Sequence, residues 1–272
     1  MERGTFATVS LADVVDLERY PIHDLGSTSG RALVERCRRD LEGLGASDLE
    51  GFMRPEAIEP VVAWAMTAMP DAYRTETQHN VYFTTPDPEL PVDDPRRIQV
   101  RSAKSGLAYD EIPLESPLRS VYESDELTAF VGAALGVDVL HRHSDPLGAL
   151  NVMYYGEGDE LGWHFDGADS VVTLMLQPSL EGGAFEYSPM LRSPDDENAD
   201  GVRSLLRGDR SGVRSMSGAP GTLALFRGHW SPHHVTPVLG ERPRINAVLS
   251  YAPTPDAVLS DFTKEMFYGR TA

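Results

Sequence analysis

Three side chains have the types and spacing needed to hold a metal ion. His164 and Asp166 lie two residues apart within the segment from Leu161 to Gly167. In an extended strand, residues two apart point to the same face, so an imidazole and a carboxylate would project side by side. A second histidine would complete the 2-His-1-carboxylate set, which holds Fe(II) and leaves coordination positions open for other ligands. We predict that His233 is this third ligand.

The choice of His233 rests on strand alternation. His229, His233 and His234 all lie in the same stretch of sequence. Adjacent residues of a strand point to opposite faces, so only one of His233 and His234 can face the metal. The order of a Gly-Thr-Leu-Ala-Leu-Phe strand, a turn and then Ser-Pro-His favours His233, because it is the histidine that enters the next strand.

A second group of residues could bind an anion near this metal. Arg244 opens an apolar strand, and Asn246 shares its face. A guanidinium carried into the interior needs a partner, and a bound carboxylate would accept two hydrogen bonds from it. Arg242, beside Pro243 in a turn, is the better candidate for an ordinary surface arginine. The hydroxyl of Tyr155 could bind the same anion, although a core tyrosine is an equally good interpretation.

The elements that must position these residues fall into two regions. Residues 1–136 are expected to be mainly helical, with helices near 29–44, 55–69 and 116–135 and one strand at 80–85. From residue 137 the pattern changes to short apolar runs separated by Gly, Pro and Asp, which is typical of a β-sandwich or barrel. These runs are residues 147–155, 170–176, 183–187, 221–226 and 244–251.

We therefore predict a single domain that is mainly β with flanking helices. Its core would span 137–252, followed by a C-terminal tail at 253–272. The polar segment 188–220 interrupts the strands, and a short helix is expected within it at 199–206. This insertion is interpreted either as a lid over the site or as a tolerated surface loop.

Composition excludes several classes of protein. The net charge of −18 argues against binding to nucleic acid or to an anionic membrane surface. No apolar run approaches the roughly 18 residues that a membrane span requires. Cys37 is the only cysteine, so neither an internal disulfide nor a thiolate metal cluster can form. These features, and the lack of a signal peptide, indicate a cytoplasmic protein.

The motifs taken together resemble the Fe(II)/2-oxoglutarate-dependent oxygenases. They are Tyr-x-x-Gly-x-x-x-x-x-His-x-Asp, Glu-Gly-Gly-x-Phe-Glu-Tyr, Gly-Thr-Leu-x-Leu-Phe-x-Gly and Ser-x-His-x-Val-Thr-Pro-Val with a later Arg-x-Asn. Within that family the chain is similar to the branch of BesD-type free amino acid halogenases and related amino acid hydroxylases. The segments that carry this closer similarity are 145–152, 195–198 and 267–270.

The resemblance implies a double-stranded β-helix core, a form of jelly roll shared with cupins. It implies Fe(II) on His164, Asp166 and His233, and 2-oxoglutarate held at its distal carboxylate by Arg244, with O₂ as the oxidant. Tyr155 and Asn246 are expected beside the same carboxylate. The halogenases of this branch have glycine in place of the metal carboxylate, whereas this chain keeps Asp166. The resemblance therefore points to hydroxylation of an unactivated C–H bond in a free amino acid or a close derivative.

Other functions remain open at this stage. The same iron site could support desaturation, ring formation or halogenation. A nucleic-acid demethylase of the AlkB type is disfavoured by the negative charge. A metal-binding β-sandwich without turnover is disfavoured by Arg244, because a storage protein needs no carboxylate anchor. Arg101 and Tyr268 are candidates for substrate contacts by their position alone, and a surface role for Arg101 is the alternative.

Overall fold

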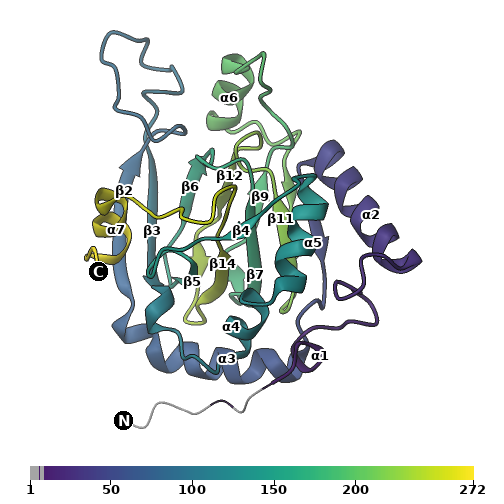
Figure 1. Ribbon diagram of the computed structural model, residues 1–272. Helices are drawn as coiled ribbons and strands as arrows, with labels where there is room; N and C mark the ends of the chain where they lie inside the picture. The colour runs from purple at the N-terminus through teal and green to yellow at the C-terminus, as the bar shows by residue number, and fades with distance from the viewer. Residues whose placement is uncertain (1–5, 7–8) are drawn as a thin grey trace.

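The computed structural model describes residue 6 and residues 9–272 (Figure 1). Its helices flank a core of antiparallel strands. They are α1 (Leu11–Val14), α2 (Thr28–Leu44), α3 (Pro55–Ala68), α4 (Pro117–Tyr122), α5 (Asp125–Leu135), α6 (Ala199–Leu206) and α7 (Asp261–Tyr268), with short 3-10 turns η1 (Met69–Asp71) and η2 (Tyr109–Glu111).

Two antiparallel sheets form the core. The larger has the order β1-β11-β7-β14-β5-β3-β2 and the smaller the order β10-β9-β12-β6. The larger sheet consists of β1 (Ala46–Leu49), β2 (Tyr73–His79), β3 (Val100–Leu107), β5 (Leu150–Tyr155), β7 (Val171–Gln177), β11 (Leu223–Phe226) and β14 (Arg244–Leu249). The smaller consists of β6 (Leu161–His164), β9 (Phe185–Tyr187), β10 (Arg214–Ser215) and β12 (His233–Val235). Two further pairs are β8 (Glu181–Gly182) with β13 (Val238–Leu239), and β4 (His141–Arg142) with β15 (Tyr251–Ala252).

The mainly β fold with flanking helices, predicted from the alternation of short apolar runs, is confirmed. Neighbouring strands of the core come from distant parts of the sequence, as in a jelly roll: β14 lies between β7 and β5, and β12 lies between β9 and β6. The outer face of the large sheet packs on the helices through a continuous apolar cluster. Its members include Leu41 of α2, Val61 of α3, Phe130 of α5 and Ile245 of β14.

The N-terminal region contributes strands as well as helices. The helices expected at 29–44 and 55–69 are present as α2 and α3. The helix expected at 116–135 is divided, because Ser124 caps a new helix by accepting a hydrogen bond from the backbone N–H of Leu127. β1, β2 and β3 extend the large sheet, so this part of the chain is built into the core rather than attached to it.

The strand predicted at 80–85 is wrong. The strand in this part of the chain is β2, which ends at His79. The side chain of Asn80 folds the following residues into a turn: its amide donates to the carbonyl oxygens of Thr84 and Arg96, and its carbonyl accepts the backbone N–H of Tyr82. Asparagine favours such local side-chain hydrogen bonds over strand pairing, a preference that the apolar content of the segment concealed.

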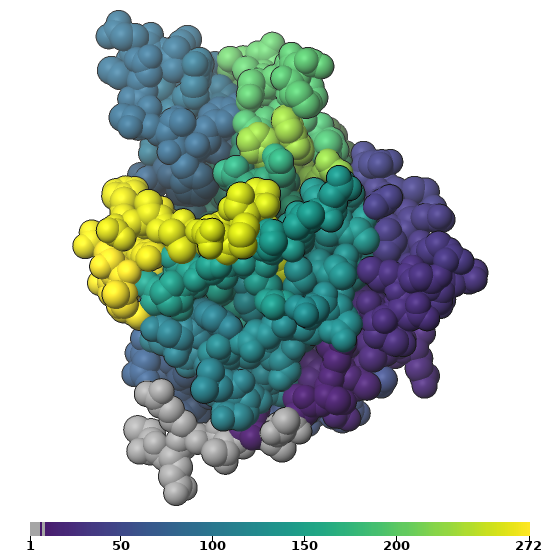
Figure 2. Space-filling view, viewed as in Figure 1, coloured from purple at the N-terminus to yellow at the C-terminus, as the bar shows by residue number. Residues whose placement is uncertain are grey.

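The segment 188–220 contains the helix predicted at 199–206, with the same ends. Val202 and Leu205 of this helix pack in one apolar cluster with Val81, Trp163 and Phe165. Figure 2 shows this segment and the turn after β2 as the two protrusions of the molecule. The described part of the chain contains no helix whose length and apolar character would allow it to cross a bilayer.

Candidate metal centre and adjoining cavity

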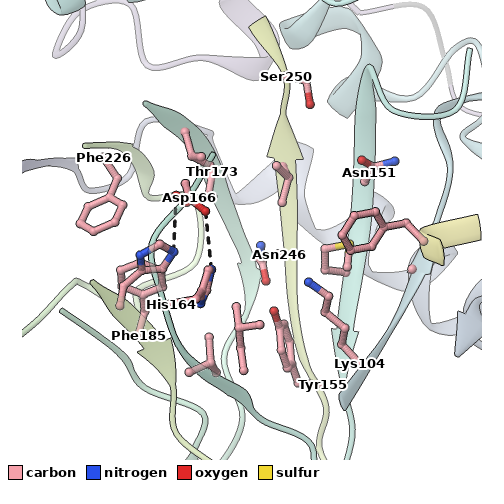
Figure 3. Close-up of a pocket in the computed structure, with 18 of the residues that line it drawn as sticks. Lys104, Asn151, Tyr155, His164, Asp166, Thr173, Phe185, Phe226, Asn246 and Ser250 are labelled. Atoms are coloured by element: carbon pink, nitrogen blue, oxygen red, sulfur yellow. Dashed lines mark ion pairs between the residues drawn. The ribbon is translucent and has the colours of Figure 1, made fainter. Parts of the chain in front are cut away.

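The structure brings His164, Asp166 and His233 together in a cavity lined by both sheets of the core (Figure 3). His164 ends β6 and His233 begins β12, and the two are directly paired across these antiparallel strands. Asp166 follows β6 by two residues. One carboxylate oxygen lies 3.5 Å from Nε2 of His164, and the other lies 3.5 Å from Nε2 of His233. Ligands on one face of an octahedron with bonds of about 2.1 Å are about 3 Å apart, so the group fits a metal ion closely.

Both imidazole rings are oriented for metal binding. Nδ1 of His164 lies 2.9 Å from the carbonyl oxygen of Gly162, and Nδ1 of His233 lies 3.1 Å from that of Ser231. A carbonyl oxygen can only accept, so each Nδ1 carries the proton and each Nε2 has a free lone pair. The rings of Phe185 and Phe226 pack against His233, with centroids 5.2 and 4.8 Å away. The backbone and these aromatic rings therefore fix the orientation of the ligands.

The ionisation states also suit a metal ligand set. Burial raises the pKa of Asp166, but His233 and His164 more than compensate and lower the pKa to about 2. Burial lowers the pKa of His233 to about 3. At neutral pH the group therefore contains an ionised carboxylate and a neutral His233, which are the forms that bind metals.

The other two histidines of the region have different partners. The ring of His234 stacks on Trp163 with centroids 3.9 Å apart, and its Nε2 lies 2.9 Å from a carboxylate oxygen of Glu186. Nδ1 of His229 lies 3.1 Å from the backbone oxygen of Asp166. Strand alternation thus separates His233 from His234 as expected, and the three-residue group contains His233 and neither neighbour.

Arg244, Tyr155 and Asn246 line the same cavity, which has a volume of about 280 Å³. Arg244 and Tyr155 are paired across β14 and β5, and the guanidinium lies 5.4 Å from the centroid of the tyrosine ring. The guanidinium donates to the side-chain oxygen of Asn246. Burial lowers the pKa of Arg244, whereas it raises that of Tyr155 to about 12. Arg242 is exposed.

Arg244 lacks a counter-charge among the described residues. No carboxylate of residues 6 and 9–272 forms an ion pair with it, and its buried Nε has no hydrogen-bond partner there. A buried guanidinium in this state costs free energy unless a ligand supplies the anion. A carboxylate of a ligand bound in this cavity would supply that anion and accept hydrogen bonds from Arg244.

The two candidate substrate residues lie in different places. Arg101 forms ion pairs with Glu76 at 2.9 Å and Glu160 at 3.1 Å, and it is not among the residues that line the cavity. Tyr268 does line the cavity, and its hydroxyl donates to the side-chain oxygen of Asn151 at 2.9 Å. The expected C-terminal tail thus contains a helix, α7, that forms part of the cavity wall.

Lys104 of β3 is a cavity residue that the sequence analysis missed. Burial lowers its pKa to about 8, against the attraction of Asp166. The signal in the sequence was its rarity, because Lys104 and Lys264 are the only lysines in the chain. Figure 3 shows its ammonium pointing into the cavity, together with Asn151 and Asn246 from neighbouring strands.

A family model named halogenase D matches residues 100–268, which is more than half of the chain. The match begins at β3 and ends at the last residue of α7, so it includes the three-residue group, Arg244 and Lys104. No curated protein matches the chain.

Solved structures share the fold at low sequence identity. AviO1 from Streptomyces viridochromogenes Tue57 has a TM-score of 0.54 and 18% identity, over 84% of this chain and 97% of that one. A 2OG-Fe(II) oxygenase family oxidoreductase from Burkholderia pseudomallei has a TM-score of 0.51 and 14% identity, over 82% and 92%. EctD from S. alaskensis, solved with 2-oxoglutarate and 5-hydroxyectoine, has a TM-score of 0.50 and 19% identity, over 79% and 74%.

Proposed function

This chain belongs to the halogenase D family and is an Fe(II)/2-oxoglutarate-dependent oxygenase, and on that premise we propose that it hydroxylates a small molecule. The bond attacked is an unactivated C–H bond, and the substrate is a free amino acid or a close derivative. His164, Asp166 and His233 hold the iron, and Arg244 holds the distal carboxylate of 2-oxoglutarate.

The observation that favours hydroxylation rather than halogenation is the presence of the Asp166 carboxylate. It lies 3.5 Å from Nε2 of both His164 and His233, in the position of a third ligand. The halogenases that the sequence resembles have glycine here, which leaves a coordination position for chloride. If Asp166 is a third protein ligand beside His164 and His233, bound 2-oxoglutarate and oxygen would leave no position for a halide.

The residues of the site bind and orient, while the bound cofactors supply the reactivity. Fe(II) and 2-oxoglutarate together activate O₂ for attack on a C–H bond. Arg244, supported by Asn246 and Tyr155, fixes the far end of 2-oxoglutarate. The apolar side chains around the iron ligands, including Phe185 and Phe226, keep water away from the reacting atoms.

The size and charge of the molecule support a small substrate. The cavity of about 280 Å³ must hold 2-oxoglutarate as well as the substrate. The net charge of −18 disfavours a nucleic-acid strand. The structure of EctD with 5-hydroxyectoine is an example of this fold bound to a hydroxylated small molecule, which supports hydroxylation here without identifying the substrate.

The test is a mass-spectrometric screen of the common amino acids with Fe(II), 2-oxoglutarate and O₂ in chloride-containing buffer. We expect succinate and a product heavier by one oxygen atom. A product lighter by two hydrogen atoms would replace hydroxylation by desaturation or ring formation. A main product with the chlorine isotope pattern would show that the carboxylate of Asp166 does not exclude halide, and the proposal would be wrong.

The role of Arg244 has its own test. Arg244→Ala should weaken 2-oxoglutarate binding by about 2–5 kcal/mol, since truncation leaves a buried carboxylate unpaired. The measurement is anaerobic titration calorimetry with 2-oxoglutarate. Arg242→Ala, in the exposed turn two residues earlier, is the matched control and should bind normally. Equal affinities for both variants would move the co-substrate anchor elsewhere.

A further inference from the structure

Lys104 is a second cation in the cavity without an anionic partner. Among residues 6 and 9–272, no carboxylate lies within ion-pair distance of its ammonium, and no hydrogen bond from that ammonium is formed. The ring centroid of Phe267 lies 5.5 Å from Nζ. The chain has 42 acidic residues, so the lack of a partner for one of its two lysines is a specific feature of the fold.

Holding this ammonium in the cavity costs free energy, because the charge loses hydration without gaining an anionic partner. A methionine or leucine at this position would fill the same space without that cost. Residues that carry such a cost in a cavity are commonly those that bind a ligand. The ligand that Lys104 suits is an anion, because an ammonium has donors and no acceptor.

The carboxylates of 2-oxoglutarate are already accounted for. In the proposed function one end would bind the metal held by His164, Asp166 and His233, and the other would pair with Arg244. The charge of Lys104 helps to lower the pKa of Asp166. It is not among the causes of the pKa shifts of Arg244 and Tyr155. The ammonium, carried on β3, lies 5.5 Å from the ring centroid of Phe267 of α7. With both ends of 2-oxoglutarate assigned in this way, the anion for Lys104 would come from a second bound acid.

We propose that Lys104 binds a carboxylate of the substrate and so selects substrates that carry one. This inference rests on the proposed function, since it assigns the substrate class of that same site. The substrate would lie with its carboxylate between β3 and α7 and its reacting carbon near the metal ligands. Asn151 and Tyr268, which are hydrogen-bonded to each other at 2.9 Å, supply polar groups on the same wall of the cavity.

The scarcity of lysine allows a direct test. Protein labelled with carbon-13 at lysine Cε should give two signals, from Lys104 and Lys264. Lys264 lies 3.1 Å from the carboxylate of Asp145 and serves as an internal control. The enzyme is loaded with zinc, which is diamagnetic, and with 2-oxoglutarate. It is then titrated with the common amino acids and their N-acetyl derivatives, and with the carboxamide counterpart of each.

We expect at least one acid to shift the Lys104 signal while its carboxamide does not, with the Lys264 signal unchanged. Lys104→Met should weaken binding of that acid by about tenfold or more, as for loss of a charged hydrogen bond. Lys104→Arg should retain most of the affinity. Both variants should bind 2-oxoglutarate as the unmodified enzyme does, which also shows that they are folded.

Three results would overturn the proposal. The first is that 2-oxoglutarate alone shifts the Lys104 signal and that Lys104→Met loses affinity for 2-oxoglutarate. The second is an acid that binds equally well to Lys104→Met. The third is that no acid shifts the signal. Because binding is measured without turnover, a substrate that binds through Lys104 but gives no hydroxylated product would count against the proposed function alone. A hydroxylation rate that is the same in Lys104→Met as in the unmodified enzyme would count against this inference alone.

Discussion

At the scale of single residues, the metal site depends on one close approach of backbone to side chain. Gly228 lies directly beside the carboxylate of Asp166: a Cβ on Gly228 would be 1.7 Å from Oδ2 and 2.6 Å from Cγ. The backbone N–H of Asp166 donates to the carbonyl oxygen of Gly228 at 3.1 Å, so the two segments cannot easily separate. The glycine of the Gly-Thr-Leu-x-Leu-Phe-x-Gly motif therefore leaves the space that the carboxylate of Asp166 occupies.

Gly228→Ala should displace the carboxylate of Asp166 and weaken metal binding, because the added methyl group occupies its position. We expect a loss of Fe(II) affinity of at least about tenfold, as for changes that disturb ligand orientation. The measurement is anaerobic Fe(II) titration. Gly218→Ala is the control, since a Cβ at Gly218 meets no atom within 4 Å. Unchanged Fe(II) affinity in Gly228→Ala would contradict the role of Asp166 as a ligand.

The buried charge of Lys104 should be visible in stability. Its pKa falls from 10.5 to about 8 on folding, so the folded protein binds fewer protons than the unfolded chain between those values. The cost is fully present below pH 8 and is relieved as the pH rises toward 10.5. At neutral pH it amounts to at most about 3.5 kcal/mol, at about 1.4 kcal/mol for each pH unit.

Metal-free Lys104→Met should accordingly be more stable than the unmodified protein at pH 7, and this advantage should shrink between pH 8 and 10. Chemical denaturation across that range measures it. Two titratable groups interact with the charge of Lys104. Asp166 attracts the ammonium and so opposes the fall in the pKa of Lys104. The pKa of His79 is lowered by burial and, to a smaller extent, by the charge of Lys104. A variant less stable than the unmodified protein at pH 7 would show that the ammonium is satisfied without ligand.

At the scale of elements, α7 is held over the cavity by a buried ion pair. Asp145 is fully buried and accepts backbone N–H groups from Leu147 and Gly148 at 2.9 Å and from Leu259 at 3.0 Å. Lys264 of α7 lies 3.1 Å from the same carboxylate. α7 also contacts β2 and β3, and Figure 2 shows the C-terminal segment lying across the surface of the molecule. The ion pair thus joins the cavity wall to the strand framework.

Lys264→Met should loosen α7 without unfolding the core, since Asp145 keeps its three backbone donors. We expect faster hydrogen exchange across residues 261–268 and weaker substrate binding, with the affinity for 2-oxoglutarate unchanged. Lys264→Arg preserves the charge and is the matched control. Exchange rates equal to those of the unmodified protein would show that contacts with β2 and β3 suffice to hold the helix.

At the scale of the whole molecule, a chain with strong negative charge contains a cavity lined by two cationic side chains, Arg244 and Lys104. The net charge of −18 repels anionic ligands at long range, while Arg244 and Lys104 attract them at short range. The same charge destabilises the compact fold by self-repulsion. The long-range repulsion of anionic ligands and the destabilisation of the fold both arise from the net negative charge. Both should therefore weaken as the ionic strength rises.

Stability should therefore rise with added sodium chloride. Between about 0.01 and 0.15 M salt the Debye length shortens from about 30 to 8 Å, which screens most of the repulsion between exposed carboxylates. We expect a higher Tm of the metal-free protein over this range, measured by calorimetry. A Tm that is constant or falls would mean that the exposed ion pairs, such as Arg207 with Asp93, outweigh the repulsion.

The sequence by itself determined the residues whose roles depend on local periodicity. The alternation of a strand places His233 and His234 on opposite faces, and Arg244 and Asn246 on the same face, before any long-range contact is known. The apolar runs likewise predicted most core strands, because each strand buries one face against the helices or the other sheet. These features follow from the geometry of the backbone over a few residues.

The tertiary structure decided the features that depend on partners distant in the sequence. Asn80 ends β2 through hydrogen bonds that reach Arg96, and Lys104, one of two lysines in the sequence, lacks a carboxylate partner because of how the chain folds. The C-terminal segment became a cavity wall through the contact of Lys264 with Asp145, more than a hundred residues earlier. Whether a charge is paired or unpaired in a cavity is set by packing of the whole chain, and local sequence carries no record of it.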